Sequence, residues 1–235
     1  MLEKGTQMWN PQDFEQRYAP KTVSDIVFAD PRSKTLVHQI ITGQRPFPIT
    51  QGKCGILLHG IPGTGKSALA KLLPDAIETH RSGQSAVHDT MHVQVQPGAN
   101  GLTLLQKIGN SAVLVPYQTS QRYYVLDEVD NLNAQAMAVL KSVMNTPGCV
   151  FVLTTNHYEA IEVAVCDRCH CIPFNAAPAH AWLPLAKRIM QDAAITGIND
   201  QQLEDVIATG KGSARDILDA LVSVVIDAHA QLATP

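Results

Sequence analysis

Gly60-Ile61-Pro62-Gly63-Thr64-Gly65-Lys66-Ser67 fits the pattern G-x-x-x-x-G-K-[S/T]. It follows a short apolar run, Cys54–His59, that predicts a buried strand, and it opens a helix predicted over Gly65–Leu73 and stopped by Pro74. Glycines let the backbone curl so that successive N–H groups point at phosphate oxygens, and the helix N-terminus adds partial positive charge. The stretch, with the adjoining Ala68, therefore predicts a phosphate-binding loop.

A second run supplies the acids that such a loop needs for a nucleoside triphosphate and Mg²⁺. The apolar residues Tyr123–Leu126 predict a strand, and Asp127 and Glu128 follow at its carboxyl end. Lys66 is expected to reach the β- and γ-phosphates, while Ser67 and Asp127 are expected to hold Mg²⁺, directly or through water. Glu128 is expected to orient and deprotonate the attacking water. The pair of motifs predicts an ATP·Mg²⁺ site.

Three further polar residues fit phosphoryl transfer. Asn156 ends a predicted strand, and because parallel strand ends line one crevice, it is expected to hydrogen-bond the attacking water or the γ-phosphate. Arg168 and Arg215 offer positive charge for the leaving γ-phosphate. Their positions favour Arg168 acting on a neighbouring subunit and Arg215 on its own. Surface salt bridges are the alternative for both arginines.

Short apolar runs alternate with helical segments up to about residue 175, which predicts a parallel sheet of five strands flanked by helices. The other strands are expected at Met91–Gln96, Cys149–Thr155 and Cys169–Phe174. The other helices are expected at Ser33–Thr42, Leu102–Leu114 and Asn133–Met144. Three helical stretches follow Pro178, at about 180–195, 200–209 and 213–231. We therefore predict an N-terminal segment (1–50), an α/β core (51–176) and a small all-α lid (177–235).

The composition is that of a globular protein. Hydrophobic residues make up 45% and charged residues 17% of 235 residues, and the net charge is −3. A negative net charge gives no overall positive field that would attract nucleic acid. The five cysteines favour a reducing compartment over a disulfide framework. Because no apolar run reaches the roughly 18–20 residues of a membrane span, we expect a soluble, cytoplasmic protein with no membrane partner.

The cysteine-rich stretch Cys166-x-x-Cys169-His170-Cys171 raises a zinc hypothesis. A zinc site usually needs a second ligand pair, and the remaining cysteines lie in predicted buried strands. If Cys169–Phe174 is a strand, Cys169 and Cys171 share one face and His170 lies on the other. We therefore favour buried strand cysteines over a metal site.

Taken together, these motifs resemble the AAA+ family, and within it the small subunits of replication clamp loaders. The resemblance runs from about Trp9 to Leu221. Trp9 and the segment Glu15–Pro20 look like the family's N-terminal W…EKYRP signature, and Lys21–Val27 continues it. The family places this segment against the adenine, which implicates Tyr18, Pro20, Ile26 and Val27.

Other motifs carry the same resemblance. Asp127–Asp130 is similar to the DEAD-type acidic box, and Ala134–Met144 is similar to the helix after it. Cys166–Cys169 resembles the Ser-Arg-Cys motif, whose arginine acts in trans, and Gly212–Arg215 resembles the sensor-2 motif. Departures are Ala19 in place of arginine, Asp167 in place of serine, and a less charged Gln94–Gly101. The sequence ends after the lid, without the family's helical collar, so assembly is expected through ATP interfaces or partners.

The resemblance implies an ATPase that forms homo- or hetero-oligomers and acts on DNA replication or repair assemblies, with DNA and a sliding clamp or helicase as partners. A helicase-loader or transposition-type ATPase is an alternative. A structural module that assembles on ATP with little hydrolysis is another. The candidate cations for contact with DNA are Lys107, Lys141, Lys187, Arg188 and Lys211.

Overall fold

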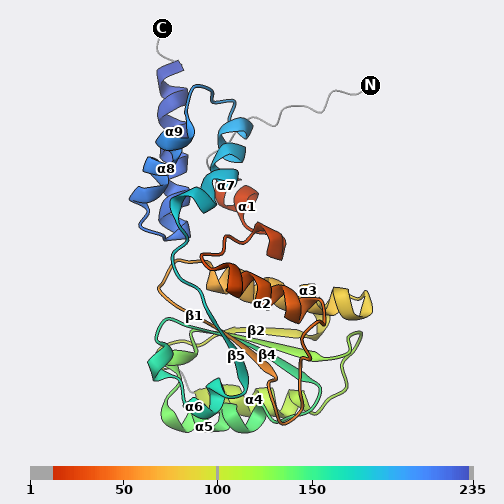
Figure 1. The fold of residues 1–235 in the computed structure, drawn as a ribbon. Helices are drawn as coiled ribbons and strands as arrows, with labels where there is room; N and C mark the ends of the chain where they lie inside the picture. Colours follow the sequence, from red (N-terminus) through yellow and green to blue (C-terminus); the bar gives the residue numbers. More distant parts are fainter. Residues whose placement is uncertain (1–12, 99–100, 233–235) are drawn as a thin grey trace. The chain divides into compact units, whose positions relative to one another are not determined.

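The computed structural model describes residues 13–98 and 101–232. The chain divides into two compact units (Figure 1). One is Lys21–Asn175, here called the α/β unit. The other, here called the helical unit, combines the described parts of Met1–Pro20 and Ala176–Pro235. Trp9, part of the N-terminal signature, lies outside the described residues.

The α/β unit is built on a parallel sheet of five strands in the order β2-β3-β4-β1-β5. The strands are β1 (Gly55–His59), β2 (Thr90–Gln94), β3 (Arg122–Asp127), β4 (Cys149–Thr155) and β5 (Cys169–Pro173). All seven residues of β4 are buried, as its near-continuous apolar sequence predicts. The predicted five-stranded parallel sheet is confirmed, with strand ends shifted by one or two residues.

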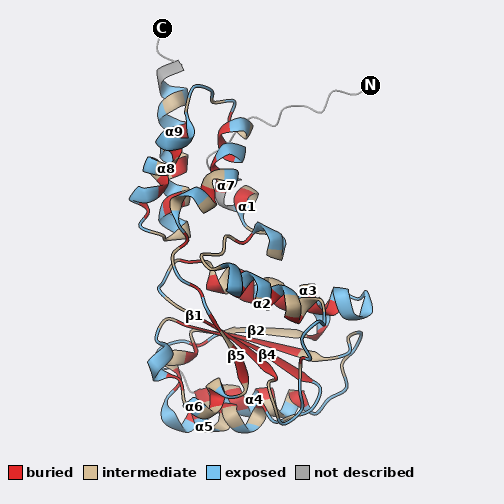
Figure 2. Ribbon diagram, viewed as in Figure 1, coloured by how far each residue is buried: buried red, intermediate tan, exposed pale blue. Residues whose placement is uncertain are grey.

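Helices cover both faces of this sheet (Figure 1). One face carries α2 (Pro31–Ile41) and α3 (Lys66–Ser82), and the other carries α4 (Gly101–Ala112), α5 (Ala134–Val143) and α6 (Val163–Cys166). Short 3-10 turns lie at Val23–Asp25, Val87–Asp89, Val129–Asn131 and Tyr158–Ala160. Each helical layer buries its apolar side against the sheet, as the burial colours show (Figure 2). The sheet therefore lies between two apolar layers.

The predicted end of one helix is wrong. Pro74 does not stop the helix of the phosphate loop, because α3 continues through it to Ser82. Proline removes one backbone hydrogen bond at this point. Leu69, Leu73 and Ile77 are nevertheless all fully buried against the sheet, on both sides of the proline. The free energy gained by burying this apolar stripe outweighs the loss of one backbone hydrogen bond. A proline in the sequence does not by itself show which of the two effects is larger.

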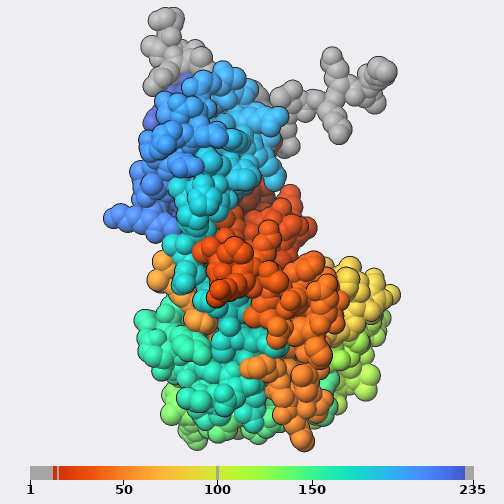
Figure 3. All heavy atoms as spheres, in the orientation of Figure 1, coloured from red at the N-terminus to blue at the C-terminus, as the bar shows by residue number. Residues whose placement is uncertain are grey.

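The segment before β1 packs on the α/β unit beside β5. Phe47 lies with its ring centroid 5.7 Å from that of His170. In the space-filling view, the orange atoms of this segment lie beside the teal atoms of the β5 region (Figure 3). The Lys53 ammonium donates to the carbonyl oxygen of Cys169 at 2.6 Å. The segment before β1 therefore packs against the sheet of the α/β unit.

The helical unit contains α1 (Phe14–Tyr18), α7 (Ala179–Asp192), α8 (Asp200–Thr209) and α9 (Ala214–Leu232). The three helical stretches predicted after Pro178 are present. Asn199 caps α8 with a capping box, its side chain accepting from the Gln202 N–H at 2.9 Å. The Tyr18 hydroxyl of α1 donates to Asp192 of α7 at 2.9 Å, which ties residues from the two ends of the chain together.

Candidate nucleotide-binding site

The phosphate-loop stretch lies where β1 ends and α3 begins, as predicted. Gly60, Gly63 and Gly65 have φ of +148°, +80° and +97°, a region that favours glycine. A Cβ at Gly60 would also lie 2.4 Å from the carbonyl oxygen of Phe174. The first N–H groups of a helix have no partner within the helix, so those of α3 are available to phosphate oxygens. The local backbone thus fits a phosphate.

Lys66 is buried at the start of α3. Its ammonium donates to the carbonyl oxygens of Gly60 at 2.8 Å and Ile61 at 2.6 Å. Burial lowers the pKa of Lys66, and the carboxylates of Asp127 and Asp130 oppose that shift. The Lys66 amino group therefore lies inside the loop, where phosphate groups would bind.

The loop and the acidic strand end meet at one hydrogen bond. The Ser67 hydroxyl of α3 donates to Asp127 Oδ1, at the end of β3, at 2.8 Å. A hydroxyl and a carboxylate at this separation, beside the phosphate loop, are oxygen ligands of the kind that Mg²⁺ takes. The two predicted metal ligands are therefore together, and the donor set fits Mg²⁺.

Glu128 follows in a left-handed conformation, with φ 59° and ψ 51°. This conformation is costly for a residue other than glycine and clusters at functional sites. Its N–H donates to the Thr154 hydroxyl at 3.0 Å. Its carboxylate accepts from Gln94 Nε2 at 3.3 Å and from Asn131 Nδ2 at 3.5 Å. Hydrogen bonds thus hold both the backbone and the carboxylate of the predicted general base.

Thr154 is a site residue that sequence reasoning missed. Its hydroxyl donates to Asp127 Oδ1 and accepts from the Glu128 N–H, so it joins the two acids. Thr154 and Thr155 are polar residues in a strand that is otherwise apolar and wholly buried. That doublet is the signal that could have identified Thr154, because a buried hydroxyl needs a hydrogen-bond partner.

Asn156 lies directly after β4, half-buried, at the carboxyl end of the sheet. In the strand order β4 stands between β3 and β1, which lead to the acids and to the phosphate loop. The topology therefore places Asn156 at the same edge as Glu128 and Gly60, as the sequence predicts.

Arg168 lies at the opposite edge. It precedes β5, and its carbonyl oxygen accepts from the N–H groups of Cys54 and Gly55, where β1 begins. The phosphate loop follows the other end of β1, about 15 Å away at 3.3 Å per residue. The guanidinium donates to Asn145 Oδ1 at 2.9 Å and to the Ala164 carbonyl oxygen at 2.7 Å. Arg168 is thus separated from its own loop by the length of a strand.

The remaining predicted residues are divided between the units. Ile26 and Val27 belong to the α/β unit, while Tyr18, Pro20 and Arg215 belong to the helical unit. Tyr18 is buried there, with the Arg17 and Arg188 guanidinium carbons 5.9 and 5.7 Å from its ring centroid. Arg215 is exposed in the first turn of α9. Their adenine and phosphate roles stay predictions.

The cysteine-rich stretch behaves as the strand interpretation predicts. Cys169 and Cys171 pack with the core under α4–α6, while His170 contacts Phe47 on the other face. Burial lowers the pKa of His170 to about 4. Over the described ranges, no group of three or more His, Cys, Asp or Glu side chains is placed to hold a metal ion.

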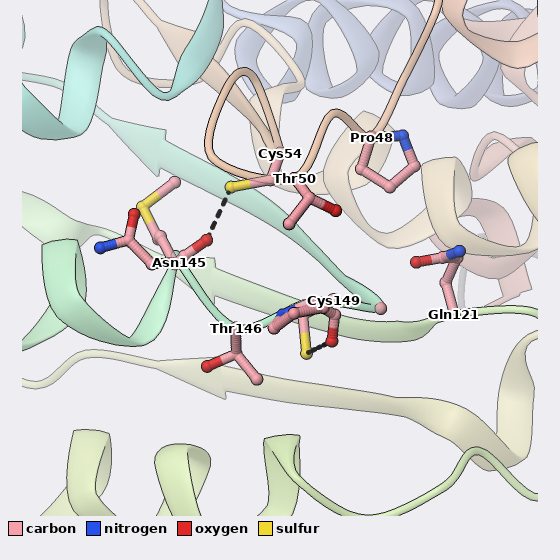
Figure 4. Close-up of a pocket in the computed structure, with 10 residues that line it drawn as sticks. Pro48, Thr50, Cys54, Gln121, Asn145, Thr146 and Cys149 are labelled. Atoms are coloured by element: carbon pink, nitrogen blue, oxygen red, sulfur yellow. Dashed lines mark hydrogen bonds between the residues drawn. The ribbon is translucent and has the colours of Figure 1, made fainter.

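A small cavity lies away from the phosphate loop, at the edge of the sheet where β1 and β4 begin (Figure 4). Thr50, Cys54, Gln121, Asn145 and Cys149 are among its lining residues. Its volume is about 80 Å³. Small-molecule sites usually measure roughly 300–1,000 Å³, so this cavity is too small for a nucleotide.

A profile of the ATPase family associated with various cellular activities (AAA) matches residues 56–174. The chain belongs to this AAA family. The matched range includes the phosphate loop, both acids, Asn156 and Arg168, and it excludes Tyr18 and Arg215.

Two relatives of this AAA chain have names from DNA replication. DNA polymerase III subunit tau of Bacillus subtilis is 23% identical over 221 residues, covering 87% of the chain and 38% of the relative. Replication factor C subunit 4 of Encephalitozoon cuniculi is 22% identical over 211 residues, covering 89% of the chain and 63% of the relative. The chain thus resembles clamp-loader-like members of the family, and it spans less than two thirds of either relative.

Solved structures share the fold of the AAA chain. A Thermotoga maritima RuvB variant has a TM-score of 0.65 at 13% identity, covering 87% of this chain and 64% of that one. A DNA polymerase III gamma subunit-related protein of Thermotoga maritima has a TM-score of 0.54 at 15% identity, covering 80% and 57%. Within the described part of the chain, no helix is long and apolar enough to cross a membrane.

Proposed function

We propose that this AAA chain is a clamp-loader-like ATPase that binds and hydrolyses ATP·Mg²⁺ in an oligomer acting on DNA replication or repair assemblies. The observation that carries the proposal is the Ser67–Asp127 hydrogen bond. It brings the phosphate loop and the acidic strand end into one site, with Glu128 next in the chain. The names of the replication relatives support the choice of pathway.

In this proposal each group of the site has a separate task. Lys66 and the N–H groups at the start of α3 bind the phosphates, while Ser67 and Asp127 hold Mg²⁺. When bound, Mg²⁺ neutralises charge that develops on the transferred phosphoryl group. Glu128 takes a proton from the attacking water, and Asn156 orients that water. Residues 177–235 act as a lid that carries Arg215.

Arg168 supports the oligomeric part of the proposal. A strand's length separates it from its own phosphate loop, while Asn145 and Ala164 hold its guanidinium in place. An arginine placed in this way supplies charge most simply to the loop of a neighbouring subunit. The partner could be a second copy or a related chain.

Three of the five candidate cations for DNA contact already have a partner within the chain. Lys141 lies 2.9 Å from Glu162, Lys187 lies 2.8 Å from Asp200, and Arg188 lies over the Tyr18 ring. Lys107 and Lys211 are exposed. We propose these two lysines as the first to test for DNA contact.

The decisive experiment measures steady-state ATP hydrolysis against protein concentration, with and without primed DNA. We expect specific activity to rise with concentration because the site needs a neighbour's arginine, and DNA to increase it further. Lys66→Ala is the inactive control. Wild type that binds ATP but hydrolyses none under any condition would contradict the stand-alone ATPase and favour the nucleotide-gated module.

A further inference from the structure

The cysteine-rich stretch that the ATPase site leaves unused has a second feature. Cys166 ends α6 and Cys171 lies in β5, and both are partly exposed. Cys171 Sγ lies 3.7 Å from the Cys166 carbonyl oxygen. The same sulfur lies 4.0 Å from the Cys169 carbonyl oxygen, and both thiols raise the pKa of the Tyr158 hydroxyl. Because Cys171 Sγ contacts the backbone of Cys166, the two thiols lie within a short movement of each other.

The other three cysteines are buried. The sulfur of Cys169 fills the space beside Gly55, where a Cβ would lie 2.6 Å from it. Cys54 donates to the Met144 carbonyl oxygen at 3.0 Å, and Cys149 Sγ lies 3.7 Å from the Ala112 carbonyl oxygen. Cys166 and Cys171 are thus both accessible to solvent and close to a second thiol.

We infer that Cys166 and Cys171 form an oxidisable dithiol that a peroxide converts into a disulfide. One thiolate attacks a peroxide oxygen, which gives a sulfenic acid and releases hydroxide. The second thiolate then attacks the sulfenic sulfur, which forms the S–S bond and releases a second hydroxide. With the two thiol protons counted, the products from hydrogen peroxide are one disulfide and two waters, and the dithiol loses two electrons.

The rate of the first step depends on thiolate formation. Burial raises the pKa of the Cys166 thiol, and the neighbouring Cys171 raises it further. Oxidation is therefore expected to be slow at neutral pH and to accelerate as pH rises. The second step is intramolecular, so a neighbouring thiol captures the sulfenic acid before further oxidation.

The disulfide would close a short ring around Arg168. It would tie the end of α6 to β5, while Arg168 itself bonds to the Ala164 carbonyl oxygen within α6. Oxidation is thus expected to constrain the backbone that presents the arginine. This consequence for activity rests on the proposed function, whereas formation of the disulfide does not.

The test treats the full chain with hydrogen peroxide, at a dose that fully oxidises glutathione in a separate tube. Free thiols are then alkylated and the protein is digested with trypsin, which cleaves after Arg168 and separates Cys166 from Cys171. We expect the intact mass to fall by two hydrogen atoms. We also expect peptides 142–168 and 169–187 to be linked until dithiothreitol is added.

Matched variants assign the link. Cys171→Ser and Cys166→Ser should abolish it, while Cys169→Ser and Cys149→Ser, in the same two peptides, should keep it. Thiols that stay alkylatable, or oxidation to sulfinic acid without a link, would overturn the inference. These readouts use no nucleotide, so they are unaffected if the ATPase proposal fails. A disulfide that leaves ATP hydrolysis unchanged would overturn the effect on Arg168.

Discussion

At the scale of single residues, the site depends on hydrogen bonds made by individual side chains. Lys66 is the simplest case, because its ammonium is held inside the phosphate loop by two carbonyl oxygens. Lys66→Ala removes a charged donor worth roughly 1.5–3 kcal/mol, or about 10- to 150-fold in binding. We expect ATP affinity to fall by that factor, measured by titration with a fluorescent ATP analogue. Lys71→Ala, an exposed lysine on the same helix, should leave affinity unchanged.

Thr154 tests whether one hydroxyl positions both acids. Thr154→Val keeps the shape but leaves the Glu128 N–H without its acceptor, at a cost of about 1–3 kcal/mol. We expect kcat for ATP hydrolysis to fall about tenfold or more with a smaller change in KM, because Glu128 acts in the chemical step.

Thr154→Ser keeps the hydroxyl and is the matched control. It should retain most of the activity, while melting temperature checks that both variants fold. Equal losses of activity in the two variants would show that Thr154 contributes packing and not hydrogen bonds.

At the scale of elements, one buried carboxylate organises the connection between α4 and β3. Asp89 accepts from the N–H groups of Tyr117, Gln118 and Thr119 at 2.7, 2.9 and 3.2 Å. Burial by itself would raise the pKa of Asp89, but these hydrogen bonds outweigh it and hold the pKa below its ordinary value. The charged form therefore stabilises the fold.

The pH dependence follows from the direction of this shift. A carboxyl with a lower pKa when folded contributes stability that is present above its unfolded pKa, about 3.9, and is lost as pH falls through its folded pKa. We expect Asp89→Asn to lower the free energy of unfolding at pH 7 by about 1–3 kcal/mol. The variant should also lose less stability than wild type on acidification, as urea denaturation at several pH values would show.

Asp200→Asn is the control for charge alone. Asp200 is exposed and pairs with Lys187 at the surface, a contact worth about 0–1 kcal/mol. If Asp200→Asn lowers stability as much as Asp89→Asn does, loss of any carboxylate has this effect. The hydrogen bonds of Asp89 would then not explain its contribution to stability.

At the scale of the whole molecule, the proposed oligomer makes a prediction that no single chain can satisfy. Lys66→Ala has a defective phosphate loop but keeps Arg168, whereas Arg168→Ala keeps the loop but lacks the arginine. Each variant alone should be inactive. Equal mixing should restore part of the activity, because some interfaces then combine an intact loop with an intact arginine.

Arg32→Ala provides a control for loss of an exposed arginine in the same unit. It should stay active by itself and need no mixing. Mixtures that stay inactive, with both proteins folded and wild type active, would contradict action of Arg168 on a neighbour. A monomeric mass at saturating ATP would do the same.

The sequence by itself determined the sheet, the phosphate loop and the acids. Five apolar runs, the glycine pattern of Gly60–Ser67 and the acids at Asp127 and Glu128 each depend on neighbouring residues only. Backbone freedom, helix termini and the apolar pattern of a strand are encoded locally, so these features can be predicted without knowing what packs against them.

Only the tertiary structure decided the rest, because it depends on contacts between distant segments. The extension of α3 through Pro74 depends on burial against the sheet. The strand order puts β4 between β3 and β1, so Asn156 follows the strand that separates the acids from the phosphate loop. The hydroxyl of Thr154 joins Asp127 and Glu128 across two adjacent strands, and local periodicity carries no information about that pairing.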